Sequence, residues 1–282
     1  MKTDLFSPHR RIESEFRTAI NRIFLRLFQL SPTDTARQID QKLAVLSSNS
    51  EFLEEIGARI ALRMATQIRA SNARSWREAA RRASRGREIY NALEREMRTN
   101  VGERVSSIVS ENARLISAIP DRIRESVNTE IAEMHRQGLR HEAIAEHLRR
   151  RVPELTRSRA ALIARTETGK ASTAITQARS EDLGIEWYQW ATSEDQRVRP
   201  SHRIMDKVLV RWSDPPSPEV LDRLPSVGRY APGEIWNCRC VALPLVALNV
   251  VSWPAVVYMN RSLRRMTRAQ FVDISGMQRR AA

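Results

Sequence analysis

Apolar residues recur at helical spacing through the first two thirds of the chain. One run places five of them at intervals of four residues: Phe52, Ile56, Ile60, Met64 and Ile68. This spacing aligns the side chains on one face of a helix. The same interval returns over residues 89–97 and 101–109. The pattern predicts a mostly helical N-terminal part whose apolar stripes pack against one another.

Two sequence signals mark expected helix starts. Ser31-Pro32 places a capping side chain before a proline at the first helical position. Ser75-Trp76-Arg77-Glu78 has the spacing of a capping box, in which the first and fourth residues bond each other's backbone. We therefore expect helices to begin directly after Ser31 and Ser75.

Glycine and proline mark expected helix ends further along. Gly138 fits the end of a helix that begins near Asp121, because glycine readily adopts the left-handed conformation of a C-terminal cap. Pro153 is expected to stop a helix over 142–151, since proline disrupts a helix interior. A longer helix is expected over about 157–181.

The pattern changes near residue 185, after which eight of the twelve prolines and five of the six tryptophans fall. Four short runs there predict strands: 186–190, 208–212, 240–248 and 250–257. Pro244 and Pro254 should confine the last two to sheet edges, because proline cannot donate to a ladder. The expected fold is α+β: a mostly helical N-terminal part followed by a small C-terminal α+β module with short strands and long Pro-rich loops.

The net charge of the chain indicates which kinds of partner it could bind. The chain has a formal net charge of +14, and nearly all of its 47 basic residues are arginine. Such an excess favours a nucleic-acid or acidic-protein partner, although arginines on solvated helix faces would give the same composition. We divide the chain into an Arg-rich helical region (1–124), the α+β module (125–257) and a basic C-terminal tail (258–282). The tail supplies six candidate nucleic-acid contacts: Arg261, Arg264, Arg265, Arg268, Arg279 and Arg280.

Both cysteines fall in one Cys-x-Cys unit, Cys238 and Cys240, downstream of His202. Thiolate and imidazole ligands suit zinc, which usually takes four ligands. Asp195 or Asp206 could complete the set. Two alternatives stay open: a pair of buried free thiols, and a disulfide, which the cytoplasm disfavours.

Two other functions are consistent with parts of the sequence. Asp195, His202 and a metal could form the active site of an enzyme acting on nucleic acid. No nucleophile arrangement or Gly-rich phosphate loop accompanies them, so we prefer a loop held by Asp–Arg pairs. Residues 131–148 also have the outline of a helix-turn-helix, a form shared by many helical hairpins that bind no DNA.

No run of about 18 apolar residues exists, so no membrane span is predicted. Residues 1–11 are polar and lack the apolar core of a signal peptide. These features predict synthesis in the cytoplasm.

Taken together, several motifs resemble the phage Mu F-like minor head protein family, also called the head morphogenesis family. They follow the family's order over about residues 125–246: Ala164-Arg165-Thr166-Glu167, Trp190-x-Thr192, Asp195-x-Arg197-Val198-Arg199-x-x-His202, Asp206, Pro232 and Asn237-Cys238-Arg239-Cys240. The chain departs from the pattern at Lys207, where the family usually has glycine. This departure puts the turn geometry there in question.

The resemblance implies a protein of a tailed phage or prophage that acts in head assembly, near the portal and inside the capsid. Our leading hypothesis is a non-enzymatic minor head protein. Its expected partners are the portal protein and the major capsid or scaffold protein, and its arginine-rich surfaces favour double-stranded DNA, bound without sequence preference, as a further partner. No small-molecule substrate is expected. Its implied location is the interior of the virion capsid, and the host cytoplasm during assembly.

Overall fold

The computed structural model describes residues 5–8, 10–81, 86–95 and 100–277. The chain forms two compact units, and neither is continuous in sequence. The helical unit comprises His9–Gln67 and Val105–Thr168. The sheet unit comprises Met1–Pro8, Ile68–Arg104 and Gly169–Ala282. The α+β class is confirmed, while this spatial division differs from the boundaries at 124 and 257 drawn along the sequence.

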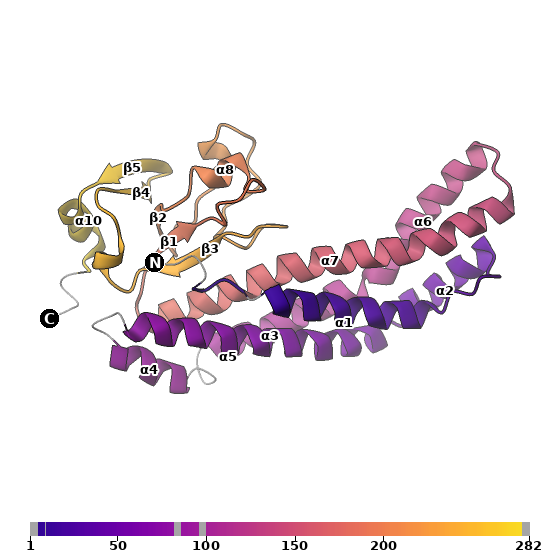
Figure 1. Ribbon diagram of the computed structural model, residues 1–282, viewed down its shortest axis with the longest axis horizontal. Coiled ribbons are helices and arrows are strands. Elements are labelled where there is room, and N and C mark those ends of the chain that lie inside the picture. Colours follow the sequence, from indigo (N-terminus) through magenta and orange to yellow (C-terminus); the bar gives the residue numbers. More distant parts are fainter. Residues whose placement is uncertain (1–4, 9, 82–85, 96–99, 278–282) are drawn as a thin grey trace. The chain divides into compact units, whose positions relative to one another are not determined.

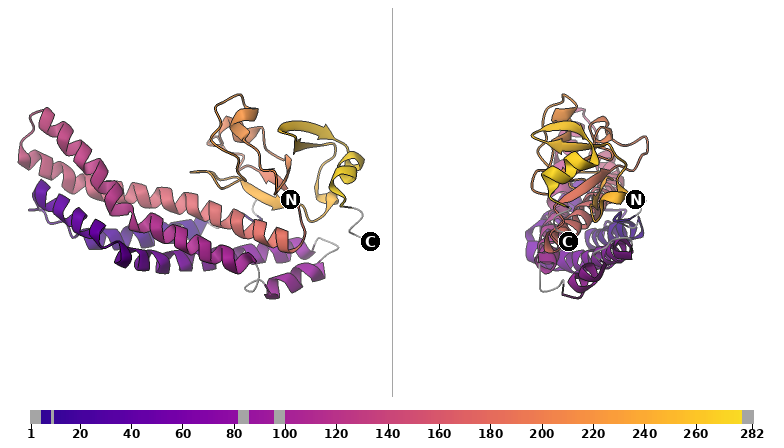
Figure 2. Two further views of the ribbon diagram at one scale, coloured as in Figure 1. Left: turned by 180° about the vertical axis from the view of Figure 1, so that it is seen from behind. Right: turned by 90° about the vertical axis from the view of Figure 1, so that its left-hand side faces the viewer.

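The helical unit is a bundle of long helices (Figures 1 and 2). Its elements are α1 (Arg10–Phe28), α2 (Ala36–Ser48), the first part of α3 (Ser50–Arg81), most of α5 (Asn100–Ser117), α6 (Ile119–Arg136) and the first part of α7 (His141–Asp182). Gly57 of α3 lies so close to α5 that an added Cβ would stand 2.9 Å from the Ala113 carbonyl oxygen. Arg124 of α6 pairs with Asp40 of α2, with Nε 2.8 Å from Oδ1.

The two expected helix starts were wrong. Helix α2 begins after Thr35, whose side chain and that of Gln38 form a capping box. This box competes with Ser31, whose backbone N–H instead donates to the Asp34 carboxylate at 2.7 Å. Ser75 lies inside α3 rather than before a helix. Trp76 next to it is fully buried. Burial of this helix face outweighs the capping signal, and the helix therefore continues past Ser75.

The expected interruption at Pro153 was also wrong, while Gly138 has φ +74° beyond the end of α6, as predicted. Helix α7 runs for 42 residues with Pro153 inside it. Val152 and Thr156 on either side are fully buried. The Thr156 hydroxyl donates to the Val152 carbonyl at 2.7 Å, which satisfies a backbone group in the turn around the proline. Packing of these neighbours outweighs the loss of one backbone hydrogen bond.

The sheet unit contains five short strands: β1 (Trp187–Ala191), β2 (Leu209–Arg211), β3 (Val241–Pro244), β4 (Ala255–Met259) and β5 (Ser262–Met266). Their order is β3-β1-β2-β4-β5. All neighbours are antiparallel except β2 and β4. Strand β3 is at an edge, as Pro244 predicted. Strand β4 is internal, because Pro254 precedes it and leaves its backbone free to pair with β5.

The segment expected to be a basic tail is largely folded. Residues 258–277 complete β4 and form β5 and α10 (Arg268–Ser275). Phe271 of α10 is fully buried, with its ring 5.0 Å from that of Trp187. This apolar anchor explains why the segment folds despite its charge. Arg279 and Arg280 lie outside the described residues.

Helices and loops complete the sheet unit. They are α4 (Gly86–Arg95), α8 (Pro200–Arg203), α9 (Pro218–Leu221) and the short 3-10 helix η2 (Leu248–Val250), together with the ends of α3 and α7. Trp76 of α3 packs in one core with Phe6 and Leu243, on one side of the sheet. Across the described part of the chain, no helix is long and apolar enough to cross a membrane.

Candidate functional site

Three side chains with metal-binding chemistry meet in the sheet unit. His202 comes from α8, and Cys238 and Cys240 come from the loop before β3. The His202 Nδ1 atom lies 3.6 Å from the Cys238 sulfur and 3.4 Å from the Cys240 sulfur. All three residues are buried, at 2%, 5% and 4% exposure. Their ligand atoms lie within 4.8 Å of one another, so a single cation could contact all three.

A tight turn aims both cysteines at the same point. Asn237 has φ +56°, a left-handed conformation that asparagine adopts more readily than most residues. The Cys238 backbone N–H then donates to the Ile235 carbonyl at 3.1 Å, and the Cys240 N–H donates to the Cys238 sulfur at 3.4 Å. Asn237 therefore has a structural reason to stand before Cys-x-Cys.

A buried chain of hydrogen bonds orients His202. Its Nε2 atom lies 3.0 Å from the Tyr230 hydroxyl, which donates to the Glu219 carboxylate at 2.6 Å. The Ser201 hydroxyl also donates to Glu219, at 3.3 Å. Burial raises the pKa of Tyr230, and its hydrogen bond to Glu219 raises it further. Tyr230 thus keeps its proton and donates a hydrogen bond to Glu219, so that its oxygen is left to accept from Nε2–H of His202.

This arrangement fixes which imidazole nitrogen faces the sulfurs. With the proton on Nε2, Nδ1 carries the lone pair and points at Cys238 and Cys240. Tyr230 and Glu219 were not among the residues predicted from the sequence. Their separation from His202 by 28 and 17 residues follows no known ligand spacing, so no signal in the sequence could have identified them.

The two thiols share their protons unequally. A hydrogen bond from Cys240 lowers the pKa of Cys238 against the opposing effect of burial, and His202 lowers it further. The same hydrogen bond, together with burial, raises the pKa of Cys240. The pair therefore loses its first proton readily and its second with difficulty.

The two carboxylates expected as further ligands have other partners. Asp195 forms an ion pair with Arg239, with Oδ1 2.7 Å from Nη2, and accepts from the Arg197 backbone at 2.9 Å. Arg239 is the main cause that holds the pKa of Asp195 below its usual value. Asp206 accepts from the backbone N–H and hydroxyl of Thr192, both at 2.9 Å. These bonds tie the loop together, and the structure brings neither carboxylate into the cluster.

The remaining motif residues divide between the two units. The Trp190 ring is fully buried and meets the His202 ring edge-on at 5.5 Å. Arg199 donates to the Trp236 carbonyl at 2.8 Å and lies over its ring. Both therefore support the loops that carry the cluster. Arg165 lies in the helical unit, 3.6 Å from Glu13, and Glu167 in that unit is buried.

Lys207, the departure from the family pattern, has φ +64°. Its backbone N–H donates to the Trp190 carbonyl at 2.8 Å. The turn therefore keeps the left-handed conformation that glycine would adopt without strain. The geometry that the sequence put in question is retained.

The last turns of α7 pack directly against the loop that precedes the cysteines. The Thr173 hydroxyl donates to the Pro232 carbonyl at 2.5 Å. A Cβ atom on Gly169 would stand 3.0 Å from the Gly233 carbonyl oxygen and 3.7 Å from that of Cys238. Gly169 thus permits the close approach of helix and loop.

Replacing Gly169 with valine should destabilise the sheet unit by about 1–3 kcal/mol, because the branched side chain pushes the loop away from α7. Urea unfolding followed by tryptophan fluorescence measures the change. Gln177→Val, at a half-buried position of the same helix, reports the cost of valine in a helix alone. Equal losses in the two variants would show that the close approach has no energetic weight.

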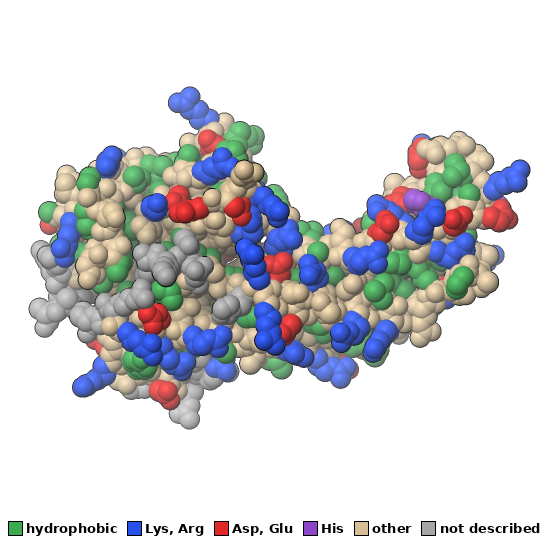
Figure 3. Space-filling model, viewed as in Figure 1, with side chains coloured by type: hydrophobic (Ala, Val, Ile, Leu, Met, Phe, Trp, Pro, Cys, Tyr) green, Lys and Arg blue, Asp and Glu red, His purple; other side chains and the backbone are tan. Residues whose placement is uncertain are grey.

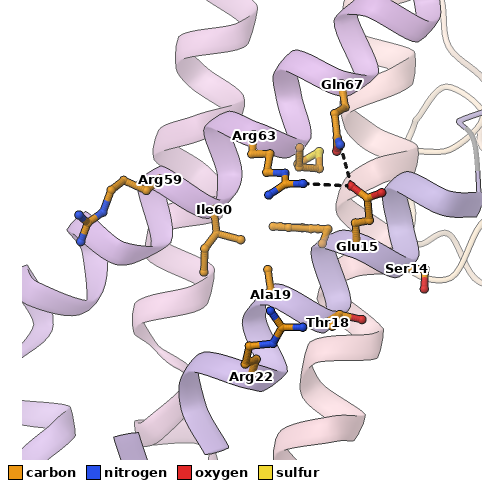
Figure 4. Close-up of a pocket in the computed structure, with 11 residues that line it drawn as sticks. Ser14, Glu15, Thr18, Ala19, Arg22, Arg59, Ile60, Arg63 and Gln67 are labelled. Carbon is orange, nitrogen blue, oxygen red and sulfur yellow. Dashed lines mark hydrogen bonds and ion pairs between the residues drawn. The ribbon is translucent and has the colours of Figure 1, made fainter. Parts of the chain in front are cut away.

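A separate hollow of about 410 Å³ lies between α1 and α3 in the helical unit (Figure 4). Phe16, Ile60 and Met64 are among its apolar lining residues. Three arginines border it: Arg22, Arg59 and Arg63. Glu15 is its one acidic lining residue and is already engaged by Gln67 at 2.8 Å and by Arg63 at 3.6 Å. The hollow therefore combines an apolar floor with an excess of positive charge.

A second basic surface lies on β5 and its neighbours. Arg261, Arg264, Arg265 and Arg268 are all exposed. Within the described part of the chain, no carboxylate pairs with these four arginines. On the face drawn in Figure 3, Lys and Arg side chains are interspersed with Asp and Glu side chains. Because β5 is an edge strand, its charges also discourage pairing with other chains.

Residues 125–243 match the family described as Phage Mu protein F like protein. A protein of Haemophilus influenzae, described as uncharacterized, is 31% identical over 150 residues, which cover 53% of this chain and 31% of that protein. The chain thus spans about a third of this relative's length. No solved structure matches the chain.

Proposed function

We propose that this chain is a minor head protein of a tailed phage or prophage, because residues 125–243 match the Phage Mu protein F like family, which implies phage head morphogenesis. The family match carries the proposal. It covers the segment whose motif residues Trp190, Arg199 and Asn237 build the loops around the buried His–Cys cluster. The proposed location is the capsid interior, near the portal.

We further propose that the hollow between α1 and α3 receives an acidic segment of another head protein, the portal protein in the first place. Arg22 has no carboxylate partner among the described residues, and the nearest carboxylate to Arg59 is Glu55 at 3.8 Å. The acidic side chains of a helical segment would pair with the arginines of the hollow, and its apolar side chains would pack on the apolar floor. The major capsid or scaffold protein is the other proposed contact.

Co-purification with the portal protein of the encoding phage tests this role. We expect the full chain to retain the portal protein at moderate salt. The double variant Arg22→Glu and Arg59→Glu should lose at least tenfold in affinity, because like charges would then face the acidic segment.

A matched control reverses two arginines on another helix, Arg122→Glu and Arg136→Glu of α6. Both are exposed and lie beside glutamates of their own helix. If this control weakens portal binding as much as the first pair, the contact is one of net charge and the hollow is not its site. Failure of the unaltered chain to retain any head protein would contradict the head role itself.

Double-stranded DNA is the second proposed partner, bound without sequence preference through the exposed arginines of β5 and α10. Changing Arg261, Arg264, Arg265 and Arg268 to glutamine should flatten the slope of log K against log salt by up to about 3.6, at about 0.9 per lost phosphate contact. Fluorescence anisotropy with a labelled duplex measures this slope. An unchanged slope would show that these arginines make no contact with DNA phosphates. Their role would then be only to prevent the edge strand β5 from pairing with other chains.

A non-enzymatic role is proposed as well, and the burial of the His–Cys cluster supports it. A catalytic metal needs a path for its substrate, whereas His202, Cys238 and Cys240 are each at most 5% exposed. The rival function is a metal-dependent nuclease, and a plasmid-nicking assay with divalent cations separates the two. Nicking that disappears in a folded His202→Ala variant would establish the enzyme. Sequence preference dependent on residues 141–148 would favour the helix-turn-helix alternative instead.

A further inference from the structure

We infer that His202, Cys238 and Cys240 bind a thiophilic divalent cation, zinc, and that Tyr230 and Glu219 are the positioning residues that orient its histidine ligand. This inference is independent of the head role. It rests on the geometry of five buried side chains that the short helices α8 and α9 and the loop between α9 and β3 bring together.

The spacing of the ligand atoms matches a tetrahedral zinc site. Zinc–sulfur bonds of about 2.3 Å and zinc–nitrogen bonds of about 2.05 Å at tetrahedral angles place sulfur about 3.6 Å from nitrogen. The two sulfurs lie 3.6 and 3.4 Å from the His202 Nδ1 atom. A cation could therefore enter with small shifts of the side chains.

The three side chains present their donor atoms to one point. Nδ1 of His202 faces both sulfurs, at 3.6 Å from Cys238 and 3.4 Å from Cys240. A zinc ion would bind both sulfurs as thiolates and take the lone pair of Nδ1.

The Tyr230–Glu219 pair supplies the outer support that metal-binding histidines generally have. Tyr230 holds the Nε2 proton at 3.0 Å, and Glu219 holds Tyr230 at 2.6 Å. The second oxygen of Glu219, Oε2, is buried without a hydrogen-bond partner among the described residues. The buried Glu219 carboxylate ends the hydrogen-bond chain from His202 through Tyr230. Its negative charge would offset the positive charge that a bound cation places on the imidazole.

The site has three protein ligands, because Asp195 and Asp206 are bonded elsewhere. Within the described residues, no other histidine, cysteine or acidic side chain joins the cluster. Zinc prefers four ligands. A small non-protein ligand, such as water, would complete the tetrahedron.

Cobalt substitution of the full reduced chain tests the inference, because cobalt reports its ligands by colour. We expect one Co²⁺ per chain, with a thiolate-to-cobalt charge-transfer band and the strong visible bands of tetrahedral coordination. Zinc should displace it stoichiometrically. Cys238→Ser, Cys240→Ser and His202→Gln should each abolish the stoichiometric complex, while His135→Gln, an exposed histidine of the helical unit, should bind as the unaltered chain does.

The positioning residues are tested by Tyr230→Phe and Glu219→Gln, which retain shape while removing one hydroxyl or one charge. Each should keep the cobalt spectrum but weaken zinc affinity by about 10–100-fold. Unchanged affinity in both would overturn their positioning role. Because these variants keep all three ligands and should keep the cobalt spectrum, a loss of affinity in them cannot be attributed to unfolding.

Two results would overturn the metal site. One is a chain that is folded by circular dichroism yet takes up no cobalt with a thiolate band. The other is an unreduced chain lighter by two hydrogens, which would show that Cys238 and Cys240 form a disulfide instead.

Discussion

If His202, Cys238 and Cys240 bind zinc as inferred, a chelator should lower the thermal unfolding midpoint of the sheet unit by roughly 8–16 °C. A ligand present at about 1,000 times its dissociation constant stabilises the folded state by about 4 kcal/mol. In a domain of this size, each kcal/mol changes the midpoint by about 2–4 °C. Differential scanning calorimetry with and without chelator measures the change, and added zinc should restore the original midpoint.

The control for this experiment is the double variant Cys238→Ser and Cys240→Ser. Its midpoint should start low and should not respond to chelator, because its ligands are gone. Identical melts of the unaltered, metal-loaded chain with and without chelator would show that the cluster is stable as free thiols.

Replacing Trp190 with alanine destabilises the sheet unit by about 3–5 kcal/mol, the usual cost of truncating a large buried aromatic residue. Trp190 is fully buried on β1, packs edge-on against His202 and lies 6.3 Å from the Tyr230 ring. Its loss leaves a cavity beside the His–Cys cluster. Urea unfolding should show a lower midpoint, and zinc affinity should fall with it.

Trp236 provides a matched control of the same residue type. It is 54% exposed, and the Arg199 guanidinium lies over its ring. Trp236→Ala should change stability by about 0.5 kcal/mol or less. If both variants lose the same stability, the burial of Trp190 is not what holds this core together.

Local sequence patterns predicted the presence of helices and strands better than the residues at which they begin and end. The intervals of four from Phe52 to Ile68 correctly indicated a helix, and Gly138 correctly marked a helix end. Pro153 and Ser75 misled because a local signal competes with burial, and Trp76 and Thr156 are buried completely. Neither burial can be read from neighbours in the sequence.

The C-terminal arginines misled for a related reason. High charge suggested a basic tail, whereas β5 pairs with β4 and the buried Phe271 packs against Trp187, which attaches the segment to the sheet. One apolar residue among charged ones gives little indication of a folded segment in the sequence. Its burial nevertheless stabilises the folded segment in the structure.

The candidate site was predictable only in part. Cysteine and histidine have a chemistry that suggests a ligand wherever they occur, so His202, Cys238 and Cys240 could be chosen before the fold was known. Asp195 and Asp206 could equally have been ligands or loop ties, and only their bonds to Arg239 and Thr192 decide for the latter. Tyr230 and Glu219 act through position alone, which only the fold provides.

Quantitative mass spectrometry of purified particles from the phage that encodes this chain tests the head-protein role most directly. The proposal predicts a few copies of the chain per particle, together with the portal and major capsid proteins. Absence of the chain from particles, while it is abundant in the host cytoplasm, would contradict it.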